Sequence, residues 1–114
     1  MAKFLIDINL KGKTAIITGA TKGIGRACSI ALHQVGANII ALGRNKKELL
    51  SLKKKLRTRI KIYQCEMNDY ENLRNIVMSQ KKIDVLINNA GTNLPEPFLK
   101  VKQSTLNTLL NINT

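Results

Sequence analysis

The chain has 114 residues, of which 44% are hydrophobic and 23% are charged. These values match ordinary globular domains and exclude a disordered or fibrous protein, and the length corresponds to one domain. The formal net charge is +12, which predicts attraction to polyanions such as nucleotides or nucleic acid without choosing among them.

The cysteines and the apolar segments indicate the cellular compartment. Cys28 and Cys65 lack the spacing of a metal cluster or a disulfide framework, so we expect two reduced, structural thiols. Residues 1–13 contain Asp7 and no long apolar run, and no segment approaches the roughly 18 apolar residues of a membrane span. We therefore expect a cytoplasmic protein with no metal site and no membrane segment.

A glycine-rich turn separates the first predicted strand from the first predicted helix. The strand covers residues 14–18, and the turn runs from Gly19 to Gly25. Apolar residues at helical spacing predict the inward face of the helix, and Gly36 is well placed to end it. These apolar residues are Ile24, Ala27, Cys28, Ala31, Leu32 and Val35.

Strands and helices alternate through the rest of the chain. Further strands are predicted at residues 38–42, 60–65 and 84–88, and a last helical pattern begins near Gln103. Such alternation implies right-handed crossovers and a parallel sheet with helices on both faces. The third strand is partly alternating, as expected of the outer strand in the order 3-2-1-4, whereas the fourth would be an apolar edge. We predict an α/β, Rossmann-type doubly wound parallel sheet over residues 1–114, of which only the first half is present.

Two helix starts carry the spacing of a capping box. Asn45 and Glu48 have this spacing ahead of a helix that runs to about Arg57. Asn68 and Glu71 repeat the spacing before the third helix.

The turn after the first strand is the strongest local signal. Its spacing is Gly-x3-Gly-x-Gly, from Gly19 through Gly23 to Gly25. Glycines allow a tight turn, close approach of the backbone to a pyrophosphate, and close packing of helix on strand, while the helix N-terminus supplies amide donors. This spacing differs from the G-x-G-x-x-G of most dinucleotide sites, and a simple tight turn would also explain it.

A second motif, Asn-Asn-Ala-Gly over residues 88–91, ends the fourth strand. With Thr-Gly-x3-Gly-x-Gly it resembles the short-chain dehydrogenase/reductase family, and the resemblance extends from about Leu10 to Thr114. It implies an oxidoreductase that passes a hydride between a nicotinamide dinucleotide and an alcohol or ketone. We expect Asn88 to tie strands together. The cofactor-binding residues implied by the resemblance are Gly19, Thr21, Lys22, Gly23, Ile24, Gly25, Arg44, Glu66, Met67, Asn89, Ala90 and Gly91.

The residues after the second strand favour NADP over NAD. In the family, an acidic residue there binds the adenosine ribose of NAD, but this chain has Gly43 and then Arg44. A guanidinium can pair with a 2′-phosphate that a carboxylate would repel, and Lys22 could reach the same phosphate. The alternative is that both side chains are solvated surface bases in a Lys-rich chain.

After the third strand the family commonly has an acid and then a hydrophobic residue, which contact the adenine. Glu66 and Met67 occupy these positions here. Glu66 is one methylene longer than the usual aspartate and retains the acceptor. A capping acid ahead of the third helix is the alternative for Glu66.

The resemblance places the asparagine of the catalytic tetrad at Asn113, although a polar residue on an ordinary helix face is the alternative. The family's proton donor is a tyrosine four residues before a lysine. The only tyrosines, Tyr63 and Tyr70, lack that lysine and precede its place in the family. We therefore expect the catalytic serine, tyrosine and lysine to lie beyond Thr114 or not to exist, and the chain alone to be inactive.

Three functions remain to be distinguished. The first is the cofactor-binding half of an NADP-dependent reductase, for which residues 92–98 resemble loops of 3-oxoacyl and sugar or polyol enzymes, and the family implies a homo-oligomer. The second is a non-catalytic dinucleotide-binding or interaction module. The third is a nucleic-acid binder, which the basic run at residues 53–59 does not support because aromatic residues for base stacking are few.

Overall fold

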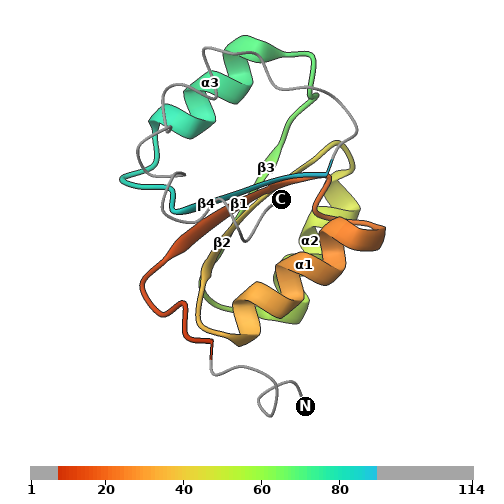
Figure 1. Cartoon of the computed structure of the whole chain (residues 1–114). Helices are drawn as coiled ribbons and strands as arrows, with labels where there is room; N and C mark the ends of the chain where they lie inside the picture. The colour runs from red at the N-terminus through yellow and green to blue at the C-terminus, as the bar shows by residue number, and fades with distance from the viewer. Residues whose placement is uncertain (1–7, 90–114) are drawn as a thin grey trace.

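The computed structural model describes residues 8–89, which form four parallel strands alternating with three helices (Figure 1). The elements are β1 (Thr14–Thr18), α1 (Gly23–Gln34), β2 (Asn38–Gly43), α2 (Lys46–Leu56), β3 (Ile60–Gln64), α3 (Tyr70–Met78) and β4 (Val85–Asn88). The strand order is β3-β2-β1-β4, so the predicted order 3-2-1-4 is confirmed.

β1 is one of the two inner strands of the sheet, and it pairs with β2 on one side and β4 on the other. Ile16 is opposite Ile40 on one neighbour and Leu86 on the other, and all three side chains are buried. The outer strand β3 is only partly buried, as its alternating sequence predicts. Because all pairs are parallel, the four carboxyl ends meet at one edge of the sheet.

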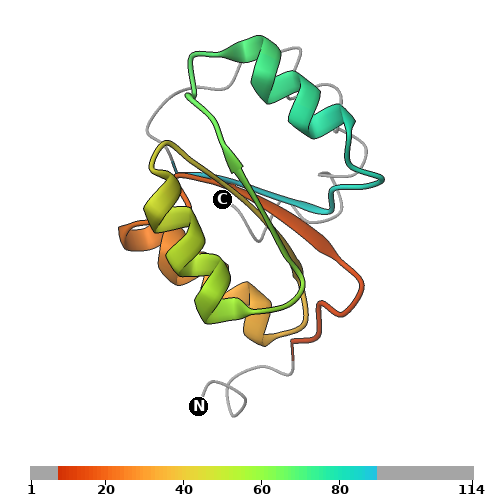
Figure 2. The ribbon, with the colours of Figure 1, turned by 180° about the vertical axis from the view of Figure 1, so that it is seen from behind.

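Helices cover both faces of the sheet, as expected. Figures 1 and 2 show α1 and α2 on one face and α3 on the other. Each face has its own apolar core. The core beneath α3 includes Ile16, Ile40, Leu42, Leu73, Ile76, Val77 and Leu86, and the core on the opposite face includes Ala15, Ile17, Ile39, Ala41, Leu49, Leu52 and Val85.

The prediction of the inward face of α1 is only partly right. Gly25 and Ser29 are the buried residues of this helix, whereas Ile24 is 72% exposed and both Ala27 and Ala31 are exposed. A Cβ atom on Gly25 would collide with the carbonyl oxygen of Gly19. The first turns of α1 therefore approach the sheet too closely for a large side chain, and the smallest residues take the inward positions.

The helix ends follow the sequence signals with one exception. Asn45 caps α2, since its side chain accepts a hydrogen bond from the Glu48 amide at 3.1 Å. Gly36 follows α1 with φ +107°, as predicted for a terminating glycine. The predicted cap at Asn68 is wrong, because the chain turns into α3 one residue later. Asp69 caps that helix and accepts from the Asn72 amide at 3.2 Å.

The basic run at the end of α2 is exposed to solvent. Lys53, Lys54 and Lys55 lie in the last turn, where positive charge is favourable for the helix dipole. Leu52 and Leu56 on the same helix are buried, so the run forms the outer face of an amphipathic helix. Within residues 8–89, every helix is too short or too polar to cross a bilayer.

Candidate functional site

A cavity of about 780 Å³ opens at the carboxyl edge of the sheet. Its walls come from the turn after β1, the residues after β2, the residues after β3, and the residue after β4. In open parallel sheets this edge is where ligands bind, and the volume suits a nucleotide-sized molecule. The lining residues are Gly19, Thr21, Lys22, Gly43, Arg44, Asn45, Glu48, Cys65, Glu66, Met67, Asn68 and Asn89.

The glycine turn forms the first wall. Gly19 and Gly23 have φ values of +60° and +53°, a backbone region that glycine enters without strain. Ala20 donates its amide to the Leu42 carbonyl at 3.1 Å, which ties the turn to the end of β2. Lys22 caps α1 without a side-chain hydrogen bond, and the first turn contains no acidic residue. The amides of that turn are therefore suited to an anion from outside the chain.

The turn is joined to the end of β4 by a small polar network. Thr18 is fully buried, and its hydroxyl donates to Asn88 Oδ1 at 3.0 Å and accepts from the Asn89 amide at 2.9 Å. Asn89 Nδ2 also donates to the Gly19 carbonyl at 3.3 Å. Asn88 thus connects β4 to β1, as predicted, and Asn89 holds the glycine turn from the opposite side.

Two cations, Lys22 and Arg44, line the cavity, and both are exposed. The Arg44 backbone is held in place, because its carbonyl accepts from Gln64 Nε2 at 2.9 Å. The Gly43 carbonyl accepts from the Cys65 amide at 2.9 Å, so the chain after β2 is fixed against the end of β3. Arg44 is therefore an exposed cation on an anchored backbone in the cavity lining.

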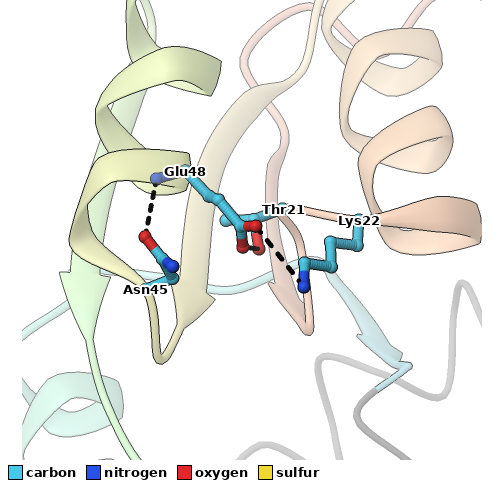
Figure 3. Close-up of polar contacts among 4 residues, drawn as sticks. All are labelled: Thr21, Lys22, Asn45 and Glu48. Carbon is cyan, nitrogen blue, oxygen red and sulfur yellow. Dashed lines mark hydrogen bonds and ion pairs between the residues drawn. The ribbon is translucent and has the colours of Figure 1, made fainter.

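Glu48 is a lining residue that the sequence reasoning did not assign to the site (Figure 3). It was expected to complete a capping box with Asn45, but its carboxylate contacts the glycine turn. Oε1 accepts from Thr21 Oγ1 at 3.1 Å, and Oε2 lies 3.4 Å from Lys22 Nζ. The sequence places Glu48 in the first turn of a helix that begins at the sheet edge, but it does not say which group the carboxylate contacts.

The residues after β3 form the remaining wall. Glu66 is exposed, and the partly buried Met67 packs against the core beneath α3. Because Asp69 caps α3, the alternative of Glu66 as its capping residue is wrong. Cys65 is also part of this wall and is 2% exposed. Burial raises the pKa of its thiol, and the charge of Asp69 adds to the effect.

The structure brings seven of the twelve predicted cofactor-binding residues to one cavity. Gly23, Ile24 and Gly25 lie beside it in the first turn of α1 and do not line it. Ala90, Gly91 and the predicted tetrad residue Asn113 lie outside the described residues. The seven lining residues are Gly19, Thr21, Lys22, Arg44, Glu66, Met67 and Asn89, and the lining residues missed are Gly43, Asn45, Glu48, Cys65 and Asn68.

Metal-binding side chains are not gathered in the described part of the chain. Residues 8–89 contain no group of three or more His, Cys, Asp or Glu residues placed to hold a metal ion. Cys28 and Cys65 are both free thiols, as predicted.

The sequence matches a family model and several known proteins. Residues 13–114 match the family model described as short chain dehydrogenase. The chain is 36% identical over 106 residues to the 3-oxoacyl-[acyl-carrier-protein] reductase FabG of Rickettsia conorii, covering 93% of this chain and 44% of that protein. It is 33% identical over 108 residues to the L-xylulose reductase of Mesocricetus auratus, covering 95% and 44%.

A solved structure with the same fold is carveol dehydrogenase from Mycobacterium avium in complex with NAD. Its TM-score is 0.66 at 30% identity, over 76% of this chain and 38% of that one. The chain spans less than half the length of the relatives it matches. The family model covers nearly all of the chain, and the sheet order, glycine turn and Asn-Asn-Ala-Gly motif agree with it. The chain belongs to the short-chain dehydrogenase family.

Proposed function

We propose that this chain is the cofactor-binding portion of an oxidoreductase that transfers a hydride between NADP(H) and an alcohol or ketone. The observation that carries the proposal is the pair of cations, Lys22 and Arg44, which line the same cavity as the glycine turn. The relatives named as reductases act on a 3-oxoacyl group and on a sugar, and both substrate classes are carbonyl compounds. The substrate of this protein is proposed to belong to the same broad class.

The residues present fit a dinucleotide. The amides at the start of α1 suit the pyrophosphate, and Gly19 and Gly23 leave the turn without side chains that would shield them. Arg44 and Lys22 would receive the 2′-phosphate, while Glu66 and Met67 would flank the adenine. Asn89, with Ala90 and Gly91, would follow the cofactor toward its nicotinamide end. The bound cofactor would supply a hydride at the nicotinamide ring.

A second candidate is a nucleotide-binding module without turnover. Within the printed sequence neither Tyr63 nor Tyr70 precedes a lysine by four residues, so the residues of this chain account for nucleotide binding and not for proton donation. Tyr63 is occupied in the fold, where its hydroxyl accepts from Gln80 Nε2 at 3.1 Å. If the protein is an enzyme, Asn113 and residues outside this chain would complete the catalytic group. We expect the 114-residue chain to bind cofactor and to show no carbonyl reduction.

The compartment and the assembly belong to the same proposal. Two free cysteines suit a reducing compartment, and we propose the cytoplasm. We further propose that the complete protein is a homo-oligomer, which light scattering coupled to gel filtration would measure.

The cofactor preference is tested by titrating NADP and NAD into the chain by calorimetry. We expect NADP to bind more tightly, and Arg44→Met to weaken NADP about tenfold while leaving NAD nearly unchanged, since one charge-assisted contact is worth about 1.5 kcal/mol or more. The matched control is Arg74→Met, which removes the same charge from an exposed position on α3 outside the cavity. This control is needed because a net charge of +12 by itself favours the more anionic nucleotide. Equal losses in both variants, or equal affinities for NADP and NAD, would contradict the proposal.

A further inference from the structure

The ion pair inside the cavity has a consequence for cofactor choice. Lys22 is one of the two cations proposed to receive a 2′-phosphate, and its ammonium group already lies 3.4 Å from a Glu48 carboxylate oxygen (Figure 3). The Lys22 side chain is 78% exposed and that of Glu48 is 32% exposed. The lysine is therefore free to move, whereas the carboxylate is the more enclosed partner.

The position of Glu48 is fixed by its surroundings. Its backbone amide is bound by the Asn45 side chain at 3.1 Å, and its other carboxylate oxygen accepts from Thr21 Oγ1 at 3.1 Å. Leu49 and Leu52, which follow on α2, are buried in the core. Moving the carboxylate would break its hydrogen bond to the Thr21 hydroxyl in the glycine turn, while the Asn45 bond and the buried leucines hold the Glu48 backbone in place. The negative charge therefore stays at the cavity wall when a ligand enters.

A fixed carboxylate has opposite effects on the two cofactors. A 2′-phosphate that pairs with Lys22 must share the ammonium with Glu48. The phosphate and the carboxylate repel each other when both contact one ammonium group. The 2′-hydroxyl of NAD carries no charge and can donate a hydrogen bond to a carboxylate. No acidic residue stands at the end of β2 to discriminate against NADP, since Gly43 is there, but a carboxylate lines the cavity from the first turn of α2.

We propose that Glu48 is a specificity residue that competes with the 2′-phosphate for Lys22 and so lowers the preference of this cavity for NADP over NAD. The proposal rests on the proposed function, because it assumes that the cavity holds a nicotinamide dinucleotide. It predicts that Arg44 favours NADP and that Glu48 reduces this preference without abolishing it. The balance between the two side chains would then set the ratio of the two affinities.

The test is Glu48→Gln, which keeps the size of the side chain and an acceptor for Thr21 and removes the charge. Affinities for NADP and NAD are measured by calorimetry on the whole chain, and we expect the ratio of affinities to shift toward NADP roughly two- to fivefold, the range for a partly exposed ion pair. In a Lys22→Met background the same substitution should shift the ratio of affinities much less, because the ammonium for which Glu48 and the 2′-phosphate compete is gone. Glu71→Gln, on the exposed face of α3, is the control for an equal change of net charge. Circular dichroism checks that each variant is folded.

The results separate this inference from the proposed function. An unchanged ratio in Glu48→Gln overturns the inference. A shift toward NAD overturns it as well and indicates instead that Glu48 holds Lys22 in its binding position. An equal shift in Glu71→Gln or in the Lys22→Met background also overturns it, since the effect would then be general electrostatics. Failure of the proposed function appears instead in the unmodified chain, as absence of binding by both dinucleotides, and it removes the inference as well.

Discussion

Gly25 offers the sharpest test of how the glycine turn is built, because its substitution by alanine has two effects of opposite sign. Gly25 lies in the first turn of α1, where alanine by itself stabilises a helix by about 1 kcal/mol relative to glycine. An added Cβ would collide with the carbonyl oxygen of Gly19 and stand 2.6 Å from Asn89 Nδ2 and 2.9 Å from the Gly19 carbonyl carbon. Contacts under 3.0 Å essentially never occur for real Cβ atoms, so the backbone must move.

The net effect of Gly25→Ala is therefore destabilising. Overpacking costs typically 1–3 kcal/mol, and we expect about 3 kcal/mol here because rigid backbone, rather than the end of a side chain, has to give way. Subtracting the gain in helix propensity leaves a loss of about 2 kcal/mol in the free energy of unfolding. For a domain of this size that corresponds to a fall in Tm of roughly 10 °C.

Gly43→Ala is the matched control. Gly43 is also buried, and its added Cβ would meet only side-chain atoms, with Thr21 Cγ2 at 3.2 Å and Leu49 Cδ2 at 3.4 Å, which can move. We expect this variant to lose less than about 1 kcal/mol. Since the chain contains no tryptophan, unfolding in urea is followed by far-ultraviolet circular dichroism. If Gly25→Ala were as stable as the unmodified chain, or lost no more than Gly43→Ala, the close approach of α1 to the turn would be refuted.

Two further predictions concern the groups around the cavity. Thr18→Val keeps the shape of a buried side chain but removes the acceptor of the Asn89 amide, so we expect a loss of about 1–3 kcal/mol and faster hydrogen exchange at that amide. Thr18→Ser should restore the protection, and unchanged exchange in Thr18→Val would contradict the network. For Cys65, a raised pKa leaves less thiolate at a given pH, so its alkylation by iodoacetamide should be slower than that of the half-buried Cys28 and should accelerate only at higher pH. Peptide mass spectrometry measures both rates, and equal rates would contradict the burial of Cys65.

The order of the elements and the family were predictable from local patterns. Apolar runs identified the strands, and the glycine turn with Asn-Asn-Ala-Gly identified the family. The partly alternating sequence of β3 placed it at an edge, because a strand buried on both faces cannot alternate. These features depend on the spacing of apolar residues within each element and on the residues of the turns, so they can be predicted without knowing how the elements pack.

The composition of the cavity was predicted in part. Lys22 and Arg44 were assigned from their places after β1 and β2, and both line it. The sequence assigned Glu48 only to a capping box, because its spacing from Asn45 describes the start of a helix. That spacing does not say which group the Glu48 carboxylate contacts. The contacts of the carboxylate depend on the distance between the start of α2 and the glycine turn, and only the folded sheet sets this distance.

By itself, the sequence determined the alternation of strands and helices, the parallel sheet and the family, because these follow from residue periodicity and from turns that only glycine and a few polar residues accept. Tertiary structure decided which face of α1 is buried and which anion meets Lys22. Helical spacing selected Ile24 for the core, but in the first turns the close approach left room only for Gly25 and Ser29, while Leu32 and Val35 pack against the core farther along. The buried face of α1 and the partner of Lys22 both depend on how near one element lies to another. The residue pattern of a single element contains no information about that distance.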